Sequence, residues 1–109
     1  MEIARLYEMQ GKEIVPGYHA KFVHSENVTI AYWDIEAGKV LPAHAHHHEQ
    51  VLNLLEGRFE VTLNGETEVL EAGAVVVIPS NAEHSGRSLT PCRIIDVFYP
   101  VRTDYIRNK

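Results

Sequence analysis

The sequence predicts one all-β domain, and three observations support this prediction. Apolar residues recur with a period of two far more often than at the spacing of a helix face. Glycine, proline and asparagine interrupt the apolar runs at intervals of roughly 8 to 12 residues. The chain has 109 residues, of which 45% are hydrophobic and 23% are charged, which is the size and composition of one globular domain.

Seven or eight short strands are expected. They span residues 28–36, 51–55, 58–63, 66–70, 74–78, 85–89 and 93–99, with a weaker strand at 17–23. The strongest local signal is Asn64-Gly65, because both residues tolerate the positive φ that a type I′ hairpin turn requires. So many strands in so short a chain must close into a barrel or stack as two sheets, because an open sheet would leave unpaired edges.

The predicted domain covers the whole chain, residues 1–109, without an internal repeat or a linker. We expect an N-terminal arm over about residues 1–25 and the barrel over about residues 26–101. The short C-terminal tail fits either one helical turn or a strand lying on a partner.

Charge and composition exclude several classes of function. The net charge is -5 with both signs scattered along the chain, so there is no basic face for nucleic acid or for an anionic membrane. No apolar run approaches the roughly 20 residues that span a bilayer, and the first ten residues lack a signal-peptide pattern, so we expect a cytoplasmic protein. The single cysteine, Cys92, is expected to be a small buried residue rather than a nucleophile.

The segment 42–50, "PAHAHHHEQ", is the strongest candidate for a functional site. In an extended chain every second side chain shares a face, which groups His44, His46, His48 and Gln50. Imidazole is the commonest side-chain ligand for transition metals, and a further ligand usually comes from a distant strand. His84, which follows "PSNAE", is the natural candidate for that ligand. A histidine-rich loop without a metal is the alternative that composition leaves open.

The frame around these histidines resembles the first motif of the cupin superfamily. That motif runs Gly, five residues, His-x-His, three residues, Glu, six residues, Gly. The matching positions are Gly38, His44, His46, Gln50 and Gly57, with Gln50 where the family has glutamate.

The second cupin motif is matched with two replacements. The matching positions are Gly73, Pro79, Asn81, His84 and Ser88, with Asn81 in place of glycine and Ser88 in place of asparagine. Asparagine is one of the few residues at ease with positive φ. The resemblance implies a jelly-roll barrel, also called a double-stranded β-helix, of six to eight strands. It also implies one divalent transition metal ion at the barrel mouth, held by His44, His46, Gln50 and His84.

Glutamine at position 50 affects the chemistry that a bound metal would support. Three histidines and one amide oxygen leave the metal charge uncompensated, which favours an anionic substrate or hydroxide. The same shell weakens the case for oxygen-activating iron, which usually takes two histidines and a carboxylate. Glu49 is an alternative carboxylate, but strand alternation places it on the opposite face. Zinc, nickel, iron and manganese all remain candidates.

Three roles are open for His48. It has the inward orientation on alternation, yet it falls among the spacer residues of the motif. The three roles are support of the metal ligands, contact with the substrate, and a bulge in the strand. We expect a substrate contact.

The segment "RIIDVFYPVR" places Asp96, Phe98 and Arg102 on one face of a strand. A buried carboxylate needs a partner, and a structural salt bridge from Asp96 to Arg102 or Arg93 is one interpretation. In the functional interpretation Asp96 is an acid/base, Phe98 is an apolar wall, and Arg102 binds a substrate carboxylate.

Three segments resemble a narrower group, the single-domain cupins of pectin degradation. They are "PAHAHHHEQ", "LLEGRFEVTLNGE" and "DVFYPVRTDY". Those cupins convert 4,5-unsaturated uronates into linear keto-sugars. The resemblance implies that Asp96, Phe98 and Arg102 line the substrate site, and we expect Asp96 and Arg102 to be catalytic.

Three functional hypotheses follow. The first is a metal-dependent isomerase-like enzyme acting on a small anionic sugar acid. The second is a non-catalytic cupin that binds a metal or a sugar, and the third is a dioxygenase acting on a small organic acid or phenol. A homodimer is expected, because outward residues such as Val51 and Leu55 would leave an apolar outer sheet face.

Overall fold

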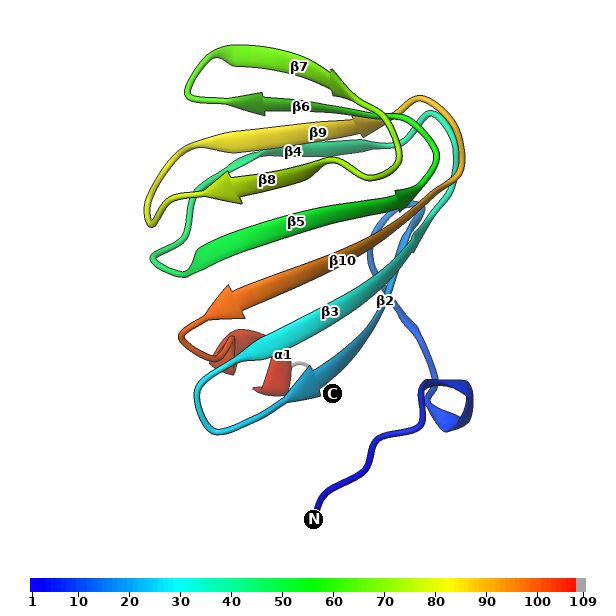
Figure 1. The fold of residues 1–109 in the computed structure, drawn as a ribbon, viewed down its shortest axis with the longest axis vertical. Helices are drawn as coiled ribbons and strands as arrows, with labels where there is room; N and C mark the ends of the chain where they lie inside the picture. The colour runs from blue at the N-terminus through cyan, green and yellow to red at the C-terminus, as the bar shows by residue number, and fades with distance from the viewer. Residues whose placement is uncertain (108–109) are drawn as a thin grey trace.

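The computed structural model describes residues 1–107 and confirms an all-β fold of two antiparallel sheets (Figure 1). The larger sheet has the strand order β1-β2-β3-β10-β5-β8 and consists of β1 (Lys12–Val15), β2 (Tyr18–His24), β3 (Thr29–Ile35), β10 (Cys92–Tyr99), β5 (Glu49–Glu56) and β8 (Val75–Ile78). The smaller sheet has the order β4-β9-β6-β7 and consists of β4 (Val40–His44), β9 (His84–Ser88), β6 (Phe59–Leu63) and β7 (Glu66–Leu70).

Two short helical segments complete the described chain, a 3₁₀ turn η1 (Leu6–Glu8) and helix α1 (Thr103–Arg107). The tail, for which a helical turn and a strand were both open, is therefore helical up to residue 107. Residues 108 and 109 of the predicted tail lie outside the described residues. Among the described residues no helix is long and apolar enough to cross a bilayer.

All eight expected strands are present, and two further strands, β1 and β4, were not expected. Neither shows a regular alternation of buried and exposed residues, and both lie at the edge of a sheet. Pro42 fits in β4 because an edge strand tolerates a residue without an N–H donor. The pairing partner in the folded chain, rather than local periodicity, makes these segments strands.

Two predicted turns are confirmed by their backbone angles. Asn64 and Gly65, which join β6 to β7, have φ values of 49° and 83°. Asn81, at the glycine position of the second motif, has a φ of 64°. Both asparagines therefore take the left-handed conformation that the sequence predicts.

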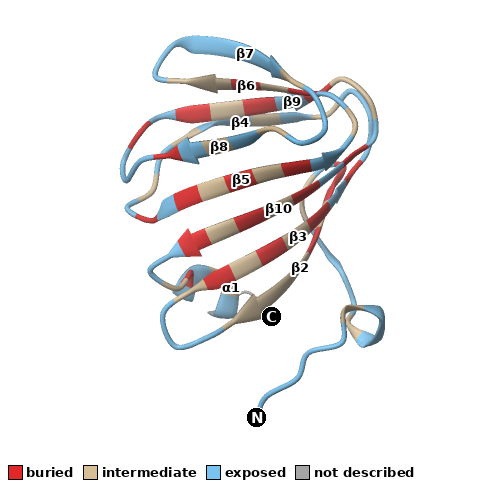
Figure 2. Cartoon of the chain, viewed as in Figure 1, coloured by how far each residue is buried: buried red, intermediate tan, exposed pale blue. Residues whose placement is uncertain are grey.

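The core lies between the two sheets, and the strands that carry it alternate buried and less buried residues (Figure 2). On β10 every second residue is buried, from Cys92 to Phe98. Burial of Cys92, a free cysteine that is 3% exposed, confirms its expected role. The buried apolar residues with the largest rings are Tyr18, Trp33, Phe59 and Phe98.

Buried polar residues gather at one end of the barrel, the mouth, where β4 and β10 end and β5 and β9 begin. Five of the seven buried polar residues that the structure describes are His48, Gln50, His84, Asp96 and Arg102, whereas Ser88 lies at the other end of β9. Burying polar groups is costly unless they are paired, so this concentration at one end marks the mouth as the candidate site.

Tyr105 of α1 packs into the mouth beside β2 and β10. Its ring stacks on Phe22 with centroids 4.4 Å apart and meets Phe98 edge-on at 6.1 Å. The C-terminal helix thus forms one wall of the mouth.

At the opposite end of the barrel, the base, His19 of β2 forms an exposed ion pair with Glu36, at 2.8 Å between Nε2 and Oε2. The hydrogen bond to Glu36 raises the pKa of His19, and the same bond lowers the pKa of Glu36. The raised histidine pKa adds stability that is present below its ordinary value of 6.5 and is lost as the pH rises through the folded-state value. The lowered glutamate pKa adds stability above 4.5 that is lost as the pH falls.

Gly57→Ala is expected to destabilise the fold more than Gly65→Ala, by about 1–3 kcal/mol. Both glycines have positive φ, 93° and 83°, so both alanines meet backbone strain. Only at Gly57 would the new Cβ also collide with the carbonyl oxygen of Pro91, whereas Gly65 has nothing within 4 Å. Urea unfolding measures the difference, and equal losses would show that the contact with Pro91 is unimportant.

Glu36→Gln is expected to lower the pKa of His19 and to remove the pair's contribution to stability between about pH 4.5 and 6.5. NMR titration of the His19 ring measures the shift. Glu56→Gln, at an exposed carboxylate on the same end of the barrel, is the matched control. An unchanged His19 pKa in Glu36→Gln would contradict the assignment.

Candidate metal centre

Three histidines meet at the mouth. His44 ends β4 and His84 begins β9, and the two are cross-strand partners with ring centroids 4.2 Å apart. His46 follows in the loop after β4, with its ring 5.0 Å from that of His84. One ligand nitrogen of each lies within 4.8 Å of the others. The folded chain thus brings together the three histidines predicted as ligands.

The segment after His44 is a loop and not the continuous extended strand that the alternation argument assumed. The turn of the second motif holds this loop in place: the Asn81 N–H donates to the His46 carbonyl at 2.8 Å, and Ser80 Oγ donates to the His47 carbonyl at 2.6 Å. His47 is exposed. Positive φ at Asn81 therefore serves to orient the backbone of a candidate ligand.

The three imidazoles share one tautomer. Each Nδ1 lies at hydrogen-bond distance from a backbone carbonyl, which is Pro42 for His44 (2.8 Å), His48 for His46 (3.0 Å) and Ala82 for His84 (2.9 Å). A carbonyl oxygen only accepts, so each Nδ1 carries the hydrogen. The lone pair of each Nε2 is left to bind a metal.

The side-chain amide oxygen of Gln50 lies beside the histidine cluster, next to His46. Its Nε2 donates to Asp96 Oδ1 at 2.9 Å, which turns Oε1 toward His46 Nε2 at 3.2 Å. Both facing atoms carry lone pairs, so neither can donate to the other. A cation between them would satisfy both.

The donors fit a divalent transition metal. His84 Nε2 is buried and has no hydrogen-bond partner among the described residues. Burial lowers the pKa of His84, and burial together with the Arg102 charge lowers the pKa of His46 to about 4. Neutral imidazole nitrogens and an amide oxygen that converge on one point suit such an ion.

Asp96 lies directly behind Gln50 and is 6% exposed. Burial raises the pKa of Asp96 to about 7, against the opposing effect of the hydrogen bond from Gln50. The indole N–H of Trp33 also lowers the pKa of Asp96, but among the described residues it has no partner that meets hydrogen-bond geometry.

The salt-bridge interpretation of Asp96 is wrong, because both candidate arginines pair elsewhere. Arg93 lies between Asp34 and Glu56, at 3.3 and 3.7 Å. Arg102 pairs with Asp104. The carboxylate is instead held by the amide of a candidate metal ligand.

Arg102 is 8% exposed and is fixed on three sides. Its guanidinium carbon lies 4.7 Å from the ring centroid of Phe98 and 4.1 Å from that of Tyr105. Asp104 accepts from its Nε at 3.0 Å and from its Nη2 at 2.7 Å. Sequence reasoning missed Asp104 and Tyr105, although both stand within three residues of Arg102 in the quoted segment "DVFYPVRTDY".

Phe98 separates the histidines from Arg102. Its ring meets the His46 ring nearly at right angles with centroids 5.7 Å apart, and Arg102 lies over it. The expected apolar wall is thus at the mouth.

His48 is 6% exposed, and its backbone carbonyl accepts the hydrogen bond from Nδ1 of His46. Its ring lies 5.4 Å from that of His46, and its buried Nδ1 has no hydrogen-bond partner among the described residues. A substrate contact through this side chain stays a prediction.

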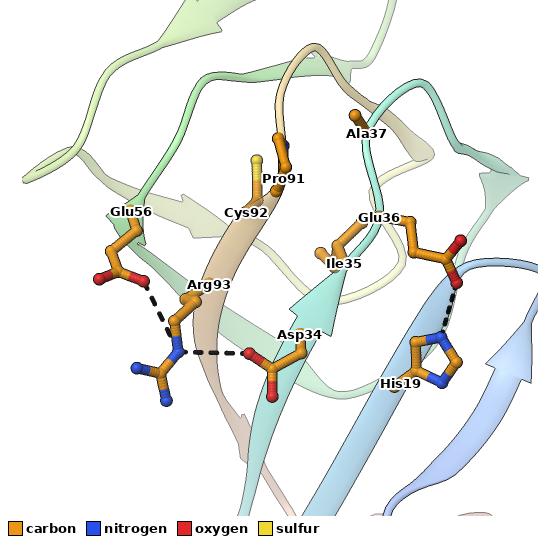
Figure 3. A pocket seen from close by; sticks show the side chains of 9 residues that line it. All are labelled: His19, Asp34, Ile35, Glu36, Ala37, Glu56, Pro91, Cys92 and Arg93. Carbon is orange, nitrogen blue, oxygen red and sulfur yellow. Dashed lines mark hydrogen bonds and ion pairs between the residues drawn. The ribbon is translucent and has the colours of Figure 1, made fainter.

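A groove of about 500 Å³ lies at the base of the barrel, at the end opposite His44, His46 and His84 (Figure 3). Arg93 reaches between Glu56 and Asp34 on one side of it, and His19 meets Glu36 on the other (Figure 3). The groove contains no member of the candidate metal centre.

Known proteins resemble this chain over most of its length. The pectin degradation protein KdgF of Dickeya dadantii is 28% identical over 102 residues, which cover 91% of this chain and 93% of that protein. The solved structure of KdgF from a Halomonas species has a TM-score of 0.86 and 30% identity, covering 91% and 93% of the two chains. An RmlC-like cupin from Shewanella frigidimarina has a TM-score of 0.90 and 25% identity, covering 96% of each chain.

A family match covers the central part of the chain. Residues 31–98, which contain both motifs and all four candidate ligands, match the cupin domain. The fold, the motifs and this match agree, and the chain belongs to the cupin family.

Proposed function

We propose that this protein is a metal-dependent cupin enzyme that converts a 4,5-unsaturated uronate, or a closely related anionic sugar acid, into a linear keto-sugar. The observation that carries the proposal is the buried hydrogen bond between Gln50 and Asp96, which puts a potential acid/base beside a neutral set of metal donors. The similarity to the KdgF proteins, one of them named for pectin degradation, supports the substrate class.

The residues that would hold the metal are His44, His46 and His84 through Nε2, and Gln50 through Oε1. A bound divalent ion would supply Lewis acidity toward a substrate oxygen. Because all four donors are neutral, its charge would favour an anionic ligand. Zinc, nickel, iron and manganese are the candidate ions.

The proposed reaction is an isomerisation, so substrate and product have the same atoms and no co-reactant is needed. The proton of the anomeric hydroxyl leaves, the bond between the ring oxygen and C1 breaks, and a proton adds at C4 as the enol becomes a ketone. Asp96 would accept and return the proton at Oδ2, because Oδ1 is held by Gln50.

Two further side chains would bind and shield the substrate. Phe98 covers the space between His46 and Arg102 and would exclude water there. Asp104 accepts from Nε and Nη2 of Arg102, and the remaining edge of the guanidinium would attract the substrate carboxylate. His48 would contact the substrate from beside His46.

A non-catalytic binding module is the second candidate, favoured by one observation. Asp104 already takes two donors of Arg102, which weakens that guanidinium as a carboxylate site. Such a module would hold a metal or a sugar-like ligand without turnover. The dioxygenase alternative is disfavoured by the amide at Gln50, and oxygen consumption with ferrous iron would reveal it. The cytoplasmic location stays a prediction.

His84→Ala is expected to weaken the binding of Zn²⁺ or Ni²⁺ at least about 100-fold, since it removes a ligand whose Nε2 is preoriented. Isothermal titration calorimetry of protein purified without a histidine tag measures affinity and a stoichiometry of one ion per chain. His47→Ala is the matched control, because His47 is exposed outside the cluster. Equal loss in both variants would contradict the proposed ligand set.

Asp96→Asn is expected to keep the metal and to lower kcat by about 10²- to 10⁴-fold. The assay follows loss of the unsaturated-uronate absorbance with metal-loaded protein. Asp34→Asn, which changes an exposed carboxylate at the base of the barrel, is the control and should leave kcat unchanged. An active Asp96→Asn variant would remove the proposed role of Asp96. Wild-type protein that binds uronates without turnover would instead support the binding module.

A further inference from the structure

Separate contacts fix the backbone, the plane and the edge of Arg102 at the mouth. The backbone N–H of Arg102 donates to Thr29 Oγ1 at 2.8 Å, which anchors it to β3. The rings of Phe98 and Tyr105 lie against the guanidinium, with centroids 4.7 and 4.1 Å from its carbon. Ring contacts of this kind hold the plane of a guanidinium but leave it free to turn within that plane. The carboxylate of Asp104 removes this remaining freedom.

Asp104 occupies one edge of the guanidinium and leaves another. A guanidinium carries five N–H donors in a planar fork. Asp104 accepts from Nε at 3.0 Å and from Nη2 at 2.7 Å, so the remaining donors are both hydrogens of Nη1 and the second hydrogen of Nη2. Nη1 and Nη2 together form an edge that matches the two oxygens of a carboxylate. Arg102 therefore keeps one bidentate edge for a ligand.

The positive charge of Arg102 reaches the histidine side of the mouth. Burial is the main cause that lowers the pKa of His46 and of His48, and the Arg102 charge is the next cause for both. The side chain of Arg102 is 9% exposed, whereas that of Asp104 is 51% exposed. The carboxylate of this pair thus meets the solvent, and the guanidinium lies inside the mouth where a substrate would bind.

Asp104 also keeps Arg102 apart from Asp96. Both Arg102 and Asp96 are buried at the mouth, and buried opposite charges are usually paired. The Asp96 carboxylate is instead held by Gln50 at 2.9 Å. A buried arginine that lost Asp104 would be left uncompensated, so it would turn toward Asp96 or toward solvent. Either movement would withdraw the free edge of the guanidinium from a ligand.

We propose that Asp104 is a positioning residue for substrate recognition: by holding Nε and Nη2 of Arg102, it presents the Nη1 edge of the guanidinium to the carboxylate of a bound sugar acid. The ligand class in this inference rests on the proposed function. If Asp104 only neutralised Arg102, its removal would strengthen the attraction for an anion. The sign of the change in affinity on loss of Asp104 therefore tests the proposal.

Isothermal titration calorimetry with galacturonate and galactose, in the presence of Zn²⁺, measures this change. Galacturonate has the carboxylate but no 4,5 double bond, so it binds without reacting, and galactose has no carboxylate. The wild-type protein is expected to bind galacturonate at least about 10-fold more tightly than galactose. Asp104→Ala is expected to weaken galacturonate binding at least about 10-fold and to leave galactose binding unchanged, because only a carboxylate uses the oriented edge. Asp104→Asn, which keeps the size of the side chain but loses one acceptor, is expected to show the same loss even where Asp104→Ala misfolds.

Further variants separate positioning from a structural role. Asp104→Glu is expected to recover part of the galacturonate affinity, because it restores a carboxylate. Arg102→Ala is expected to lose the preference for galacturonate, and adding Asp104→Ala to it should cause no further loss, since Asp104 acts through Arg102. Asp34→Ala is the matched control, because Asp34 is an exposed carboxylate that pairs with Arg93 at the base. It should leave both affinities unchanged.

Three results would overturn the proposal. Unchanged or tighter binding of galacturonate by Asp104→Ala would show that Asp104 only neutralises Arg102. A further loss in the double variant would show that Asp104 acts independently of Arg102. Equal binding of the two sugars by the wild-type protein would show that the carboxylate is not recognised. These measurements need no turnover, so a failure of the proposed function would be seen separately, as a lack of uronate conversion in the absorbance assay.

Discussion

The hydrogen bond from Gln50 to Asp96 determines which amide atom of Gln50 faces the candidate metal ligands. An amide can turn either its oxygen or its nitrogen toward a metal, and donation to Asp96 Oδ1 at 2.9 Å decides for the oxygen. Glutamate at position 50 would put two buried carboxylates in contact, which repel each other unless one is protonated. The departure from the cupin motif at Gln50 and the buried carboxylate at Asp96 therefore belong together.

The imidazoles are oriented locally but assembled by tertiary pairing. Each of the three Nδ1 atoms donates to a carbonyl two residues away in the chain, so the backbone near each histidine selects its tautomer. Their meeting depends on the pairing of β4 with β9, which makes His44 and His84 neighbours. The turn at Asn81 then holds His46 against them. Local and long-range contacts are both needed for one donor set.

Charge is distributed differently over the mouth, the base and the outer face. At the mouth, the Arg102 cation is compensated by Asp104 and shielded by two aromatic rings. At the base, exposed pairs such as His19 with Glu36 compensate each other in solvent, where they contribute little. Between these ends, the larger sheet exposes apolar side chains such as Val75 and Val77.

Local sequence was enough to predict the eight expected strands and the turns at Asn64-Gly65 and Asn81. These features depend on backbone preferences and residue spacing, which a sequence displays directly. The meeting of His44, His46 and His84 was predicted from the resemblance to the cupin motifs. Only the folded structure shows that β1 and β4 are strands and that Asp96 bonds to Gln50 rather than to an arginine. Those outcomes depend on which segments lie side by side after folding, because hydrogen bonds and burial join residues that periodicity along the chain cannot relate.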